Sequence, residues 1–373
     1  MRTTPANNID VKRLNRSNTL RCLLRCDKIS QPELAQKLKL SWPTVLQNVK
    51  ELTALGLVQE VGAYESTGGR KAKAYAPVRD ARLAVGLDIT QNHVSLVLVN
   101  LSGDIVRYMR KKRVFSLQED YLASLGDLLT DFLEDGEDKK LLGIGVSLPG
   151  ILDKAGERLL YSHALDIYDV ETKLFSQHLP YPCIFFNDAN AAGMAELWKN
   201  PEVENLIYLS LSNTVGGAII NGGSLYSGNN LRAGEFGHMT LVPNGRKCYC
   251  GKVGCMDAYL SAKVLSSHAD GNLTQFFERL RDQDPQAQVI WTEYLQYLAV
   301  AINNLCMSFD CDVIAGGYVG AFLKEFGIPL WDMLAERNTF ERSGNYLKEC
   351  SFKLEASAMG AALMQVEHFL QTL

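Results

Sequence analysis

One histidine and three cysteines, gathered within eighteen residues, are the side chains with the clearest chemistry in this sequence: His238, Cys248, Cys250 and Cys255. Glycines 251 and 254 allow the backbone between them to turn tightly. Four nitrogen and sulfur ligands complete a tetrahedral zinc shell with no open position, which is typical of a structural metal. We therefore predict one structural Zn2+ per chain. The alternative is a set of ordinary buried thiols, but the other six cysteines lie singly or in a loose pair.

The residues just before the cysteines connect this metal motif to a family. Gly234-Glu235-Phe236-Gly237-His238 together with the cysteine cluster resembles the signature of the ROK family, which contains bacterial sugar kinases and sugar-responsive transcriptional repressors. Segments 187–192 and 222–228 also resemble family motifs, and the resemblance covers residues 83–373. It implies a two-lobed α/β actin-like (ribonuclease H-like) sugar kinase fold, with a first lobe of residues 81–195 plus 356–373 and a second lobe of residues 196–355 that carries the zinc site.

The resemblance also implies a sugar-binding cleft between the lobes. Asp188 takes the place of the catalytic base if the protein is a kinase, although an aspartate here can also simply cap a helix. The family usually has glutamate where this chain has Asp257, and the shorter side chain leaves room for a different or larger ligand. The implied sugar ligands are Asn187, Asp188, Glu235, His238 and Asp257.

The nucleotide half of the cleft departs from the family pattern. Family kinases carry Asp-x-Gly-Gly-Thr after the first strand, where residues 88–92 here read Asp-Ile-Thr-Gln-Asn. A second phosphate loop, at 212–216, keeps only its last glycine, and residues 315–318 place a bulky tyrosine after two glycines. Side chains at these points prevent close approach of the backbone to phosphate oxygens. We therefore expect a non-catalytic sugar sensor; the alternatives are an active ATP-dependent sugar kinase with an appended DNA-binding domain, and a scaffold without sugar binding.

The first eighty residues have the opposite charge to the rest of the chain. Residues 1–80 hold 14 Lys and Arg against 7 Asp and Glu, and residues 81–373 hold 24 against 35. Such asymmetry suggests an appended nucleic-acid-binding module. Periodicity and capping residues predict helices over 11–24 and 30–38, the first with Leu14 among its core residues, and a third helix capped by Ser41. Two strands, at 57–61 and 72–76, complete a winged helix-turn-helix domain over residues 1–80.

The third helix is expected to enter the major groove of double-stranded operator DNA. Its outward side chains are predicted to be Thr44, Gln47, Asn48 and Lys50. The hairpin tip resembles the wing of ROK repressors, which implies that Arg70 reaches into the minor groove and that Lys71 contacts phosphate. For each of these side chains the alternative is a solvated polar residue. A single winged helix covers a short site, so we expect a homodimer or tetramer.

Composition sets broad limits. The chain of 373 residues is 47% hydrophobic and 21% charged, which is normal for a globular protein. No apolar run reaches membrane length, and no signal peptide is evident. An odd number of cysteines, with three assigned to metal, favours a reducing compartment, so we predict a cytoplasmic protein that does not bind membranes. Altogether the sequence predicts a transcriptional regulator, a repressor, that senses a sugar or sugar phosphate in a degenerate kinase cleft.

Overall fold

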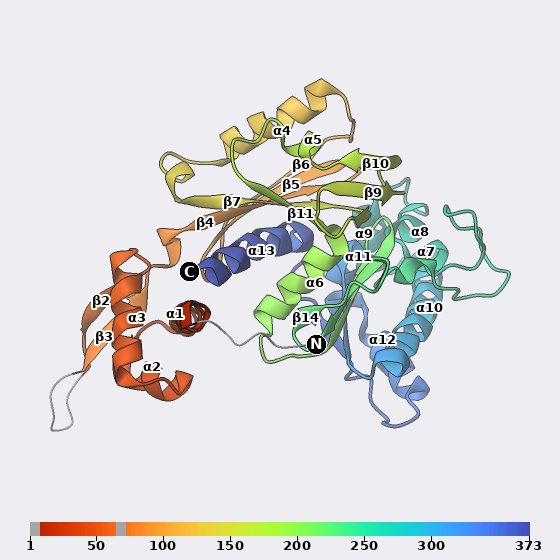
Figure 1. Ribbon diagram of the computed structural model, residues 1–373. Coiled ribbons are helices and arrows are strands. Elements are labelled where there is room, and N and C mark those ends of the chain that lie inside the picture. The colour runs from red at the N-terminus through yellow and green to blue at the C-terminus, as the bar shows by residue number, and fades with distance from the viewer. Residues whose placement is uncertain (1–7, 65–71) are drawn as a thin grey trace.

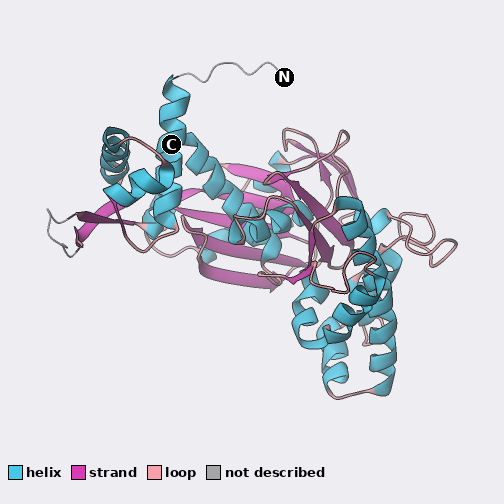
Figure 2. Ribbon diagram, turned by 90° about the horizontal axis from the view of Figure 1, so that it is seen from below, coloured by secondary structure: helices cyan, strands magenta, loops and turns pink. Residues whose placement is uncertain are grey.

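The computed structural model describes residues 8–64 and 72–373. It contains a small helical domain at one end, a first sheet covered by helices on both faces, and a second sheet with helices packed against it (Figure 1). The helical domain is formed by the N-terminal part of the chain, and the C-terminal helix α13 lies between it and the first sheet (Figures 1 and 2). No helix in the described ranges is both long and apolar enough to cross a bilayer.

The helical domain is a winged helix-turn-helix. Ser30 caps α2 by accepting a hydrogen bond from the Glu33 backbone N–H, and the Glu33 carboxylate accepts one from the Ser30 N–H, as in a capping box. Ser41 caps α3 in the same way through the Thr44 N–H. These local signals explain why the two helices begin where the sequence predicts. The helices are α1 (Asn8–Leu24), α2 (Gln31–Leu38) and α3 (Trp42–Ala54).

The wing is a hairpin of β2 (Val58–Ala63) and β3 (Lys73–Pro77), and a short strand β1 (Ile29–Ser30) pairs with the other edge of β3. The sequence does not reveal β1, because two residues show no periodicity. The wing tip, with Arg70 and Lys71, lies outside the described residues. The expectation that Leu14 belongs to the core is wrong: Leu14 is 59% exposed, because the first turns of α1 extend beyond the other helices.

The first sheet has the strand order β11-β7-β4-β5-β6. Strand β4 shows how it is covered: Val85 and Leu87 face α4, whereas Ala84 faces α13 on the other side. Gly86 is required on the α13 face, because a Cβ there would overlap the carbonyl oxygen of Ala358. The elements are β4 (Leu83–Ile89), β5 (His93–Asn100), β6 (Ile105–Lys112), α4 (Glu119–Phe132), β7 (Leu141–Leu148), β11 (Cys183–Asn187) and α13 (Ala356–Thr372).

A small antiparallel sheet follows β7, and it bears on the functional site. It has the order β10-β9-β8 and is built from β8 (Ile151–Leu152), β9 (Arg158–Ser162) and β10 (Ile167–Glu171), with the short helix α5 (Lys173–Ser176) after it. Helix α6 (Asp188–Lys199) starts directly after β11 and runs along α13 (Figure 1). The same helix also packs against the second sheet, so α6 lies between the two sheets.

The second sheet has the order β14-β13-β12-β15-β16 and repeats the mixed pattern of the first. Its main apolar core forms between β12, β13 and β15 and the long helix α10, with Leu298 and Ile302 fully buried. Its strands are β12 (Leu206–Leu211), β13 (Val215–Asn221), β14 (Ser224–Leu225), β15 (Asp312–Gly316) and β16 (Leu347–Glu349). Its helices are η3 (Phe236–His238), α7 (Asp257–Leu260), α8 (Ala262–Ser266), α9 (Leu273–Arg281), α10 (Pro285–Phe309), α11 (Gly317–Phe326) and α12 (Ile328–Arg337).

The winged helix domain is docked on α13. Leu20 and Leu23 of α1 are fully buried in a cluster shared with Val366 of α13. The Arg21 guanidinium forms two hydrogen bonds of 2.7 Å with the Glu367 carboxylate, a bidentate ion pair. The winged helix domain is therefore held on α13 by apolar packing and an ion pair, in addition to the short connection of residues 78–82.

Candidate functional site

The predicted metal ligands lie together in the loop between β14 and α7. The imidazole of His238 and the thiols of Cys248, Cys250 and Cys255 lie within 4.8 Å of one another, and this is the one such group within residues 8–64 and 72–373. Cys250 Sγ and Cys255 Sγ are 3.8 Å apart. A tetrahedral site with Zn–S bonds of about 2.3 Å separates its sulfur atoms by about 3.8 Å. The four side chains therefore have a spacing that can hold a metal ion.

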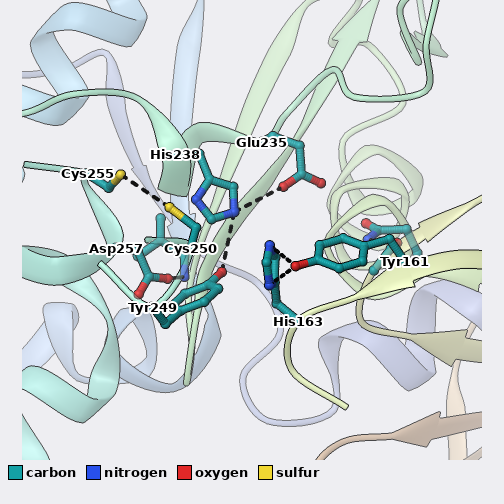
Figure 3. A network of polar contacts seen from close by, with 11 residues as sticks. Tyr161, His163, Glu235, His238, Tyr249, Cys250, Cys255 and Asp257 are labelled. Atoms are coloured by element: carbon teal, nitrogen blue, oxygen red, sulfur yellow. Dashed lines mark hydrogen bonds and ion pairs between the residues drawn. The ribbon is translucent and has the colours of Figure 1, made fainter. Parts of the chain in front are cut away.

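The ring of His238 has a different environment on each side. Its Nδ1 is buried and has no hydrogen-bond partner in the described part of the chain. Its Nε2 lies 3.5 Å from the Tyr249 hydroxyl and 4.0 Å from Glu235 Oε2 (Figure 3). An unpartnered buried nitrogen is costly unless it binds something, and a metal ion would satisfy Nδ1. The other nitrogen then faces the cavity beside Glu235.

A cavity of about 1420 Å3 lies next to the metal loop and is lined by both sheets' loops. It brings together four of the five residues that the family resemblance implies for sugar binding: Asn187, Asp188, Glu235 and His238. Asn187 ends β11 and Asp188 begins α6, while Glu235 and His238 belong to the η3 turn. Polar residues separated by about fifty positions in the sequence thus line one cavity.

Asn187 and Asp188 differ in how their polar atoms are used. Asn187 is the N-cap of α6: its Oδ1 accepts from the Asn190 N–H at 2.9 Å, and its Nδ2 donates to the Gly150 carbonyl at 2.8 Å. The cap is thus Asn187 rather than Asp188. Burial, together with the nearby carboxylates of Asp88 and Glu235, raises the pKa of Asp188 to about 7. A carboxyl group with this pKa can accept a hydrogen bond from a hydroxyl or donate one to it.

Asp257 does not line the cavity, contrary to its expected place among the sugar ligands. Its side chain is 4% exposed, and Oδ2 accepts a hydrogen bond of 2.6 Å from the Val215 N–H. Burial raises the pKa of Asp257 to about 6, and that hydrogen bond opposes the shift. The shorter side chain of aspartate reaches the start of β13 instead of the cavity, so it fixes the loop between β12 and β13.

The opposite end of the cleft, where family kinases place the nucleotide, is almost filled. The cavity there measures about 50 Å3 and is lined by the three altered segments, among them Thr90, Asn213 and Tyr318. Ligand pockets typically measure about 300–1,000 Å3. Arg110 of β6 donates a hydrogen bond of 3.2 Å to the Tyr318 hydroxyl and lies 5.0 Å from the ring centroid. Tyr318 therefore occupies this end and ties α11 to the first sheet.

Helix α3 does not present every side chain that the sequence predicts. Gln47 and Lys50 are exposed, and Thr44 is half-buried. Asn48 is 6% exposed, and its Nδ2 donates a hydrogen bond of 2.9 Å to Thr19 Oγ1 of α1. The predicted outward position of Asn48 is wrong, because it follows Val45 by three residues and lies on the same buried face of the helix. Leu46, which is 47% exposed, lies on the outer face, although it was not among the predicted outward side chains.

The fold and the site together define a winged helix-turn-helix joined to a sugar-kinase-like body. A model described as the ROK family matches residues 84–367, so the chain belongs to the ROK family. A second model, described as winged helix-turn-helix DNA-binding, matches residues 14–59.

Individual proteins agree with this assignment. The chain is 28% identical over 388 residues to a putative xylose repressor of Caldicellulosiruptor sp., covering 96% of this chain and 97% of that protein. A crystal structure of a ROK family transcriptional regulator, homologous to the E. coli MLC protein, superposes with a TM-score of 0.76 at 20% identity, covering 97% of each chain. A ROK glucokinase from Streptomyces griseus, solved with glucose and AMPPNP, covers 76% of this chain and 98% of its own, with a TM-score of 0.61 at 22% identity. At such identities the two structures show the shared fold.

Proposed function

We propose that the chain is a sugar-responsive transcriptional repressor whose kinase-like body senses a sugar or sugar phosphate. The observation that carries this proposal is the contrast between the two ends of the cleft. The end that contains the side chains of Asp188, Glu235 and His238 has about 1420 Å3 of space, whereas the cavity at the nucleotide end measures about 50 Å3. The match to a putative xylose repressor over nearly the whole of both chains supports the same function.

We further propose that the body is not a useful kinase. A base at Asp188 would take the proton from a sugar hydroxyl, and this promotes phosphoryl transfer only when other residues hold a nucleotide phosphate next to that hydroxyl oxygen. Tyr318 lines the small cavity where a nucleotide would have to bind. Sugar-dependent ADP formation is therefore expected to be far below ordinary kinase rates of about 1–100 per second. Turnover at those rates, abolished by Asp188→Asn, would show an active kinase instead.

The metal is proposed to be Zn2+, one per chain, with a structural role. Three thiolates and one imidazole are ligands that zinc prefers, and four of them leave no coordination position for a substrate. His238 Nδ1 supplies the nitrogen ligand, which fixes the ring so that Nε2 can donate to a sugar hydroxyl.

DNA binding is assigned to the outer face of α3 and to the wing. Thr44, Gln47 and Lys50 are the proposed contacts from α3, joined by Leu46, with Arg70 and Lys71 from the wing. A cytoplasmic homodimer would present two such units, and a tetramer two pairs of them, to twofold-symmetric operator DNA. The proposed division is residues 1–80 for DNA binding, 81–195 plus 356–373 for the first lobe, and 196–355 for the second.

The central test is a DNA-binding titration with and without sugar. DNA fragments are first selected by the purified protein from a random pool, and affinity for the selected sequence is compared with that for a scrambled one. D-xylose, D-glucose, N-acetylglucosamine and their phosphates are then titrated onto the complex. We expect sequence preference and a change in affinity with at least one sugar. Equal affinity for both DNAs, or no effect of any sugar at saturation, would contradict the proposal.

A further inference from the structure

Several aromatic rings that no sugar-binding motif includes meet in the wall of the large cavity. Tyr161 lies in β9 of the small sheet, His163 directly follows that strand, and Tyr249 belongs to the metal loop. All three line the cavity. The ring centroids of His163 and Tyr249 are 5.1 Å apart, and those of His163 and His238 are 5.7 Å apart. Figure 3 shows His163 between Tyr161 on one side and Tyr249 and His238 on the other. The group therefore bridges the two halves of the cleft.

Each ring is held by a part of the structure that already serves the site. Tyr249 lies between two of the clustered thiols, Cys248 and Cys250, so metal binding would fix its backbone. The Tyr161 hydroxyl contacts the ring of His163. The small sheet is joined to the sugar-binding segment, because Asn187 donates a hydrogen bond to the Gly150 carbonyl just before β8. The small sheet is thus directly connected to the segment that carries the proposed sugar ligands.

The aromatic rings can contact the apolar part of a sugar, which the polar residues of the site do not bind. Carboxylates and an imidazole bind the hydroxyl groups of a sugar, but a pyranose ring also has an apolar face of C–H groups. The π face of an aromatic ring carries negative charge density and packs favourably against polarised C–H groups. Binding sites for small molecules commonly combine such aromatic walls with a few polar groups that set orientation.

We propose that Tyr161, His163 and Tyr249 form an aromatic clamp that binds the C–H face of a pyranose sugar, while Asp188, Glu235 and His238 bind its hydroxyls. This inference rests on the proposed sugar-sensing function and adds the class of ligand. A closed sugar ring presents a rigid C–H face, whereas the corresponding open-chain alditol presents the same kinds of hydroxyl on a flexible chain. The clamp therefore selects cyclic sugars over alditols.

The test compares sugars with their alditols on clamp variants. Binding of D-xylose against xylitol, D-glucose against sorbitol, and N-acetylglucosamine is measured by calorimetry for the full chain and for Tyr249→Ala, Tyr249→Phe and His163→Ala. Each Ala variant is expected to weaken binding of the cyclic sugar about 2- to 12-fold, with a smaller effect on the alditol, and Tyr249→Phe is expected to keep most of the affinity. Tyr226→Ala is the matched control, because Tyr226 is 52% exposed and does not line the cavity.

Measuring the metal content of Tyr249→Ala distinguishes the loss of the Tyr249 ring from disruption of the metal loop. If Tyr249→Ala retains the same stoichiometric metal as the wild type and loses preference for the cyclic sugar, the clamp is supported. If both Ala variants retain the metal and bind every sugar as tightly as the wild type, the clamp is overturned while sugar sensing stands. If the wild type binds none of these sugars, both the clamp and the proposed function are overturned.

Discussion

His238 has two proposed roles, one for each nitrogen of its ring. Nδ1 faces the thiols and lacks a protein partner in the described ranges, and Nε2 faces Glu235 and Tyr249 in the cavity. A metal on the first nitrogen fixes the tautomer, so that the second carries the proton and donates to the ligand. The proposed metal site and the proposed sugar site therefore share a residue, and damage to one is expected to affect the other.

Replacing Cys250 with serine is expected to remove the metal and weaken sugar binding. A hydroxyl is a poor zinc ligand compared with a thiolate, and a structural zinc supplies on the order of 10 kcal/mol to the folding of its own loop in small peptides. Elemental analysis should show loss of stoichiometric zinc, and calorimetry should show weaker sugar binding. Cys306→Ser, at a cysteine outside the cluster, is the control and should retain both properties. Normal sugar affinity in metal-free Cys250→Ser protein would separate the two sites.

Asp188 is expected to make stability depend on pH. Its pKa is raised from 3.8 to about 7, so between these values the folded chain keeps a proton that the unfolded chain has lost. Stability contributed by the protonated form is therefore lost as the pH rises toward 7. Asp188→Asn should flatten this dependence and raise the free energy of unfolding above pH 7 by on the order of 1–2 kcal/mol.

Thermal or denaturant unfolding from pH 4 to pH 8 measures the effect, and the same variant should lose sugar affinity. Identical pH profiles of stability for the wild type and Asp188→Asn would show that the surroundings do not raise the pKa of this carboxyl group.

At the scale of elements, helix α3 must both complete the core of the DNA-binding domain and present a surface to DNA. Val45, Val49 and Leu52 are fully or almost fully buried, and Asn48 lies on the same face. Its amide donates to Thr19 Oγ1, which in turn donates to the Asn15 carbonyl. This chain of hydrogen bonds joins α3 to α1 inside the domain.

Two neighbouring amides in α3 are therefore predicted to behave differently. Asn48→Ala leaves the buried Thr19 hydroxyl without a donor and should destabilise the domain by about 1–3 kcal/mol. Gln47→Ala, at an exposed position, should change stability by less than about 0.5 kcal/mol and relax the preference for particular bases. Denaturant unfolding and DNA binding to a set of point-mutated sites distinguish the two. A stable Asn48→Ala variant with altered base preference would instead show that Asn48 contacts DNA.

At the scale of the whole molecule, α6 and α13 connect the proposed sugar site to the DNA-binding domain. Helix α6 begins at Asp188 in the cavity and runs along α13, and Gly360 allows α13 to approach Ala191 of α6 closely. At the other end of α6, Trp198 donates a hydrogen bond to the Ser102 carbonyl, and the Ser102 hydroxyl donates to Leu24 at the end of α1. Movement of α6 on sugar binding would therefore reach the DNA-binding domain through packed elements.

Breaking the ion pair between α1 and α13 is expected to reduce this coupling. Coupling free energies are typically about 1–3 kcal/mol and are reciprocal, so sugar and DNA change each other's affinity by the same factor. Glu367→Gln should lower that factor at least about threefold while leaving sugar binding in the absence of DNA unchanged. Glu325→Gln is the control, because Glu325 pairs with Arg281 in the same bidentate way far from the domain interface. An unchanged factor in Glu367→Gln, or equal loss in both variants, would contradict this route.

The sequence by itself determined the features that depend on neighbours along the chain. The caps of α2 and α3, the wing strands and the spacing of the metal ligands follow from local backbone preferences and short loops. The resemblance of its motifs to the ROK family added the two-lobed fold and the place of the cleft. The match of the family model to residues 84–367 confirms the family.

Only the tertiary structure decided which polar groups form hydrogen bonds or ion pairs within the protein. Asn48 meets Thr19 across 29 positions, Asp257 meets Val215 across 42, and Arg21 meets Glu367 across 346. The same holds for the aromatic clamp, whose rings come from the small sheet and from the metal loop. A polar residue in a helix or loop has the same local preferences whether it faces water, DNA or a buried partner. Which of these surroundings the residue has depends on how distant segments pack, because packing excludes water from a buried polar group and brings a hydrogen-bond partner to it.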